Sequence, residues 1–66
     1  MNIPEHRLRV STAECGFELT YRSKESPNNG IPVVQAVRAV LTRDRFCKKN
    51  NLSPSLDMQI EVVKDA

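Results

Sequence analysis

The sequence predicts a small two-layer α+β domain of order β-β-α-β, with one helix packed on one face of a mainly antiparallel three-stranded sheet. Two observations lead to this fold class. Three stretches alternate apolar and polar residues with the period of a strand, and one longer stretch repeats apolar residues with the period of a helix. Each stretch can bury only one face, so the apolar face of the sheet is expected to pack on the apolar stripe of the helix.

Length and composition set the limits of the fold. The 66 residues are enough for a single domain, residues 1–66, and a chain of this size buries only about 60% of the surface that it exposes when unfolded. The two cysteines permit one disulfide at most and are expected to be free thiols in a cytoplasmic protein. No apolar stretch has the length of a membrane span, and the N-terminus lacks the apolar core of a signal peptide, so no membrane association is expected.

The first third of the chain predicts a β-hairpin over about residues 6–23. Two alternating stretches flank a short connector that contains Gly16, and such a pattern is typical of two antiparallel neighbours. Gly16 can take the positive φ that many hairpin turns require. The residues expected to form the apolar face of the hairpin are Leu8, Val10, Phe17, Leu19 and Tyr21.

The middle of the chain predicts a loop followed by an amphipathic helix. Ser, Pro, Asn and Gly dominate the loop, residues 24–30, and the helix is expected over about residues 32–47, with Pro32 in its first turn. Asn50 and Asn51 follow, and asparagine often ends a helix in the left-handed conformation. The apolar arc expected to face the sheet comprises Val33, Val37, Val40 and Leu41.

The last part of the chain predicts a third strand over about residues 56–63. Leu56, Met58, Ile60 and Val62 alternate with polar residues, as in a strand with one buried face. A second helix is the alternative, because Ser53-Pro54 is also typical of a helix start. The helix would leave Met58 and Val62 off its apolar face, which favours the strand. Antiparallel pairing with the first strand would make the first strand central. The residues expected to be most buried are Leu8, Phe17, Leu19, Val37, Leu41 and Ile60.

Residues that could carry out catalysis are few and scattered. His6 is the only histidine, and together with Cys15 and Cys47 it lacks the paired spacing of a zinc site. Gly16 and Gly30 are the only glycines, too few for a phosphate-binding loop. We therefore expect no enzyme activity, no metal and no cofactor.

Positive charge is concentrated in the predicted helix. Five of the ten Lys and Arg residues lie between positions 38 and 49, beside one acid, Asp44. Spacings of seven and four residues place three of the cations along one side of the helix, and the other two flank them. This basic ridge could bind an acidic protein surface or phosphates, or could simply be the solvated side of the helix. Its members are Arg38, Arg43, Arg45, Lys48 and Lys49.

No motif in the sequence identifies a family. At the level of architecture alone, a β-β-α-β chain of this size is similar to small phage-encoded inhibitors of host RNA polymerase or of CRISPR complexes, which act by covering a charged surface of a larger machine. That similarity implies a non-enzymatic, protein-binding regulator or inhibitor whose partner is a larger protein with an acidic patch, bound by the basic ridge or a sheet edge. A nucleic-acid-binding module and a structural or assembly subunit, such as a homodimer, are the alternatives. The outer face of the predicted sheet has no aromatic residue for stacking bases, which disfavours nucleic acid.

Overall fold

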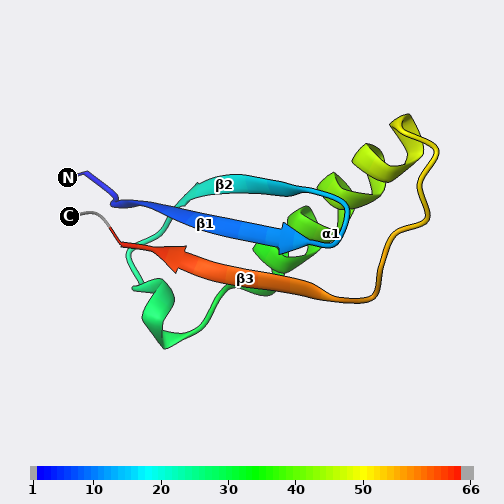
Figure 1. The fold of residues 1–66 in the computed structure, drawn as a ribbon. Helices are drawn as coiled ribbons and strands as arrows, with labels where there is room; N and C mark the ends of the chain where they lie inside the picture. The colour runs from blue at the N-terminus through cyan, green and yellow to red at the C-terminus, as the bar shows by residue number, and fades with distance from the viewer. Residues whose placement is uncertain (1, 65–66) are drawn as a thin grey trace.

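A computed structural model describes residues 2–64 as a three-stranded antiparallel sheet with one α-helix against one of its faces (Figure 1). The strands are β1 (Glu5–Thr12), β2 (Gly16–Arg22) and β3 (Met58–Val63). The helix is α1 (Val33–Lys49), and a short 3-10 helix, η1 (Pro27–Asn29), precedes it. The predicted α+β fold class is therefore confirmed.

The sheet has the order β2-β1-β3, so the first strand is central. β1 pairs antiparallel with both neighbours, which places Val10 between Phe17 on one side and Ile60 on the other. Leu8 and Val10 are completely buried. The strand interpretation of the C-terminal stretch is confirmed and its helical alternative is wrong, but the strand begins at Met58 rather than at residue 56, and Leu56 is fully exposed before it.

The hairpin turn between β1 and β2 is built by a threonine rather than by a glycine. The Thr12 N–H donates to the Cys15 carbonyl over 2.8 Å, and Thr12 Oγ1 accepts hydrogen bonds from the N–H groups of Glu14 (3.3 Å) and Cys15 (3.0 Å). A hydroxyl that accepts bonds from the next residues closes a tight turn by itself. Gly16 does not use the positive φ that is open to it, because among the described residues only Gly30 and Asn51 have a positive φ.

The residues at both ends of α1 explain where the helix begins and ends. Gly30, at φ 125°, connects η1 to the helix in a conformation that other residues rarely adopt, and Pro32 is the N-cap. The helix continues to Lys49, past the predicted end at residue 47, and Asn51 follows at φ 57°. The expected left-handed asparagine is thus confirmed.

The helix is rotated relative to the orientation that its apolar arc predicted. Gln35, Ala39 and Cys47 are its buried residues, and Ala39 belongs to the same buried cluster as Val10 and Leu19. A residue as small as alanine lets the helix backbone approach the sheet closely, whereas a valine there would hold the two layers apart. The apolar arc instead faces outward, with exposed fractions of 79% for Val33, 48% for Val37 and 50% for Leu41.

The predicted core is therefore right in part for the sheet and wrong for the helix. Leu8 and Leu19 are buried, as predicted. Phe17 and Ile60 are only partly buried, and they pack against the cluster formed by Val10, Leu19 and Ala39. Val37 and Leu41, which were expected among the most buried residues, are half exposed and belong to the outer surface of α1.

The central strand should dominate stability. We expect Leu8→Ala to lower the free energy of unfolding by about 2–5 kcal/mol, because it empties a fully buried position in a small core. Leu56 makes a matched control, since its side chain is completely exposed. Leu56→Ala should change the unfolding free energy by about 0.5 kcal/mol or less. Urea titration followed by far-UV circular dichroism measures both, and equal effects of the two substitutions would contradict this core.

Candidate interaction surfaces

Three of the five predicted basic residues lie at the end of α1 and are free. The molecule is elongated, 44 × 19 × 18 Å, and the C-terminal end of α1 projects past the β1–β2 turn (Figure 1). Arg45, Lys48 and Lys49 are exposed there. Within residues 2–64 their side chains form neither a hydrogen bond nor an ion pair. Their charge is therefore available to a partner.

Arg38 lies on the same helix but is held by the fold. Its guanidinium donates to the Thr20 carbonyl over 3.1 Å and to Gln35 Oε1 over 2.6 Å. Because β2 is an edge strand, this bond satisfies an edge carbonyl and fastens α1 to the outer side of β2. Arg38 thus has a structural partner that its place in the sequence did not reveal.

Arg43 is turned toward the protein, and its side chain is only 14% exposed. Its Nη1 donates to the Ser55 carbonyl over 2.9 Å, and its Nη2 donates to Asp44 Oδ1 over 3.1 Å. The structure therefore separates the predicted ridge into two groups. Arg38 and Arg43 bind the rest of the chain, and the remaining three cations face solvent.

The segment bound by Arg43 is also bound by the hairpin turn. Glu14 Oε1 accepts the Ser55 N–H over 2.6 Å, and Glu14 Oε2 accepts the Ser55 hydroxyl over 3.1 Å. Burial acts to raise the pKa of this carboxyl, but hydrogen bonds from its own N–H, from the Ser55 hydroxyl and N–H and from the Thr12 hydroxyl outweigh it. The pKa of Glu14 consequently lies below its ordinary value of 4.5.

This carboxyl should make stability depend on pH. A group whose pKa is lower in the folded than in the unfolded state stabilises the fold above its unfolded pKa, and the contribution is lost as the pH falls through the folded pKa. We expect Glu14→Gln to be less stable than the wild type at neutral pH, and the difference to shrink as the pH falls below 4.5. Urea titrations across that range measure it.

Glu25→Gln is the control for this measurement, because Glu25 is exposed on the loop before η1. It should not alter the pH dependence. If the difference in unfolding free energy between the wild type and Glu14→Gln stayed the same at every pH, the ionised carboxylate of Glu14 would contribute nothing to stability through its bonds to Ser55.

Two exposed apolar residues lie near the free cations at this end of the helix. Phe46 is 37% exposed and Leu52 45% exposed, and the Leu52 N–H donates to the Cys47 carbonyl over 2.8 Å, which folds the chain back over the end of α1. The sequence pattern identifies the cations but not Leu52, because Leu52 lies outside every periodic stretch. We call this surface the helix tip; its members are Arg45, Phe46, Lys48, Lys49 and Leu52.

A second surface lies along the side of α1 that faces β3. It is an apolar groove of about 260 Å³ between the helix and the start of that strand. Sequence reasoning missed it because it assigned most of these residues to the core. All of its lining residues are apolar: Val33, Ala36, Val37, Val40, Leu41 and Met58.

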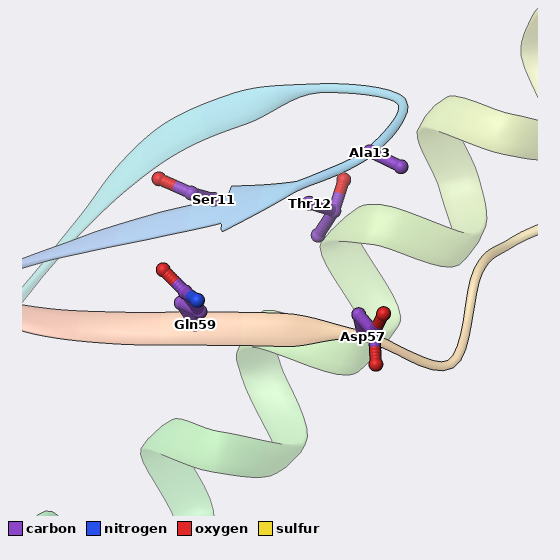
Figure 2. Close-up of a pocket in the computed structure, with 5 residues that line it drawn as sticks. All are labelled: Ser11, Thr12, Ala13, Asp57 and Gln59. Carbon is purple, nitrogen blue, oxygen red and sulfur yellow. The ribbon is translucent and has the colours of Figure 1, made fainter.

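Figure 2 shows a third, polar hollow of about 200 Å³ beside the end of β1 and the start of β3. Ser11 and Gln59 are cross-strand partners there, and Asp57 precedes β3. Asp57 is the only titratable group among the lining residues, so the hollow has no acid–base pair and no activated nucleophile. Thr12 and Ala13 complete its lining.

Cys15 and Cys47 are both free thiols. Cys15 is half-buried, Cys47 is almost fully buried, and burial raises the pKa of the Cys47 thiol, which opposes its reactivity. Among the described residues, no group of three or more His, Cys, Asp and Glu side chains could hold a metal ion. Over the same residues, no helix has the length and apolar character needed to cross a membrane.

Comparison of the chain with protein-family models, with curated proteins and with solved structures found no match. Its function is therefore inferred from the surfaces described above.

Proposed function

We propose that this protein is a small, non-enzymatic regulator or inhibitor that binds an acidic patch on a larger protein through the helix tip. One observation carries the proposal: at the projecting end of α1, three cations that have no partner among residues 2–64 lie close in the chain to two exposed apolar side chains. The two free thiols suit action in the cytoplasm.

The composition of the helix tip suits a protein partner. Protein interfaces usually combine an apolar centre that excludes water with a charged rim that orients the partner and speeds association. Phe46 and Leu52 would supply the centre, and Arg45, Lys48 and Lys49 the rim. Part of the charge also has a local role, because Lys48 and Lys49 lie in the last helical turn and interact favourably with the helix dipole. Arg45 lies before that turn, so an interaction with the helix dipole does not account for its positive charge.

Binding to single-stranded nucleic acid is the second candidate, and it rests on Phe46. An exposed aromatic ring beside several cations can stack on a base while the cations contact phosphates. The helix tip has only three free cations and one aromatic ring, which is a small surface for binding a nucleic-acid strand by base stacking and phosphate contacts. The two candidates differ in salt dependence: binding to several phosphates weakens steeply with salt, and binding through an apolar centre weakens less.

Charge reversal at the helix tip tests the proposal. The double substitution Arg45→Glu and Lys49→Glu should abolish binding without unfolding the protein, because exposed substitutions usually shift stability by about 0.5 kcal/mol or less. A matched control, Lys24→Glu with Lys64→Glu, makes the same change in net charge at exposed positions away from the tip and should bind normally. Tagged wild-type protein is used to isolate and identify the partner, and purified partner is then titrated with each variant at two salt concentrations.

The expected result is a nuclease-resistant protein complex that is lost in the tip variant, kept in the control and only moderately weakened by salt. Retention of full affinity by the tip variant would refute the helix tip as the binding site. Nuclease-sensitive material with steep salt dependence would replace the proposal by the nucleic-acid candidate.

A further inference from the structure

The inner face of the sheet is unevenly covered. On β2, Leu19 and Tyr21 are each only 8% exposed, whereas Met58, Ile60 and Val62 on β3 are all partly exposed. The helix approaches β2 more closely than either other strand. The side of the sheet that carries β3 is therefore only partly covered by this chain.

A geometric limit explains the uneven cover. An α-helix with its side chains is about 10 Å wide, whereas three strands spaced about 4.8 Å apart present a wider surface. Arg38 fixes the helix on the β2 side through its bond to the Thr20 carbonyl. The apolar groove that includes Val37, Leu41 and Met58 is the space left between the helix and β3.

We propose that this groove packs against the same groove of a second copy of the chain, forming a symmetric dimer. The inference goes beyond the proposed function, since it uses a different surface and none of the helix-tip residues. In a two-fold dimer the same patch of both copies meets, so the residues of the patch must be able to pack against an identical set of residues. A groove lined by apolar residues alone meets that requirement, because no charge has to be buried.

The spacing along α1 favours an antiparallel pair of helices. Val33, Val37 and Leu41 follow one another at intervals of four residues along one ridge, and such ridges pack into the grooves of a facing helix. With the two-fold axis at Val37, Val33 of one copy meets Leu41 of the other. The pattern is thus self-complementary about its middle residue.

Charge also favours the antiparallel arrangement. Lys48 lies eleven residues beyond Val37, which at a rise of 1.5 Å per residue places the two Lys48 residues about 33 Å apart in an antiparallel pair. This separation is several times the Debye length of about 8 Å at physiological salt, so their repulsion is screened. Parallel helices would bring both basic tips together. The charge distribution therefore suits a second copy in the antiparallel orientation.

The exposed apolar area suits a dimer that dissociates on dilution. Val33, Val34, Val37 and Leu41 together expose the equivalent of more than two whole aliphatic side chains, on the order of 200 Å² of apolar surface per copy. Two copies would bury about 400 Å² of this apolar surface, well below the roughly 1,200 Å² of the smallest stable interfaces, as in a weak and transient contact. We therefore expect a reversible monomer–dimer equilibrium.

Sedimentation velocity of the purified full chain tests the dimer. The 7.5 kDa wild-type chain should shift from monomer to twice that mass as its concentration rises over about two orders of magnitude. Val37→Glu should remain a monomer throughout with an unchanged circular dichroism spectrum, because it places a carboxylate at the centre of the contact. Ile3→Glu is the matched control: Ile3 is exposed to 46% against 48% for Val37, it lies outside the groove, and its variant should dimerise like the wild type.

A covalent readout tests whether Val37 lies at the centre of the contact. Val37→Cys should form an intermolecular disulfide on mild oxidation with diamide and trap a dimer, whereas Ile3→Cys should not. A wild-type chain that stays monomeric at every concentration would overturn the proposal, as would open-ended oligomers or equal dimerisation of Val37→Glu. No larger partner is present in these experiments, so their failure would leave the helix-tip proposal untouched, and loss of tip binding would leave the dimer untouched.

Discussion

The mismatch in width between one helix and three strands shapes the whole molecule. α1 contacts the sheet through small or polar positions, above all Ala39, and this close contact draws the helix toward β1 and β2. The valine-rich side of the helix then covers β3 only in part and is largely exposed beside it. Both the apolar groove and the partial exposure of β3 follow from this one constraint.

Polar side chains fix the helix where apolar packing alone would not. Arg38 joins α1 to the edge of β2, and Arg43 joins it to Ser55 in the segment before β3. Glu14 binds the same serine from the hairpin turn, so three segments distant in the sequence meet at one residue. The bonds to Ser55 hold groups that are partly shielded from water, where losing one member would leave the other unsatisfied. The basic residues of α1 thus include structural members as well as free ones.

The sheet could be predicted from the sequence, and the helix orientation could not. Alternation with period two assigns each strand residue to one of two faces, and burial of Leu8, Val10 and Leu19 leaves no second solution. A helix has no such binary choice, because an apolar arc shows only that the helix is amphipathic and not which partner the arc meets. The candidate site could also be predicted only in part. Counting charges along the sequence identifies Arg45 as a basic residue of the helix. It does not show that Arg38 and Arg43 are bound to the rest of the protein, because their partners lie 18 and 12 positions away in the sequence. Such pairings are set by the tertiary fold.

The two proposed surfaces lie on different parts of α1, and this separation has a functional consequence. The groove involves the first half of the helix, and the helix tip involves its last turns and Leu52. In the proposed antiparallel dimer the tips point in opposite directions, so one dimer would present two basic tips to two acidic patches. Engaging one patch would raise the effective concentration of the second tip near a neighbouring patch, provided that the spacing matches. A partner with repeated acidic patches would then be bound more tightly than a single tip allows, and dilution of the dimer would weaken binding without any change at the tip itself.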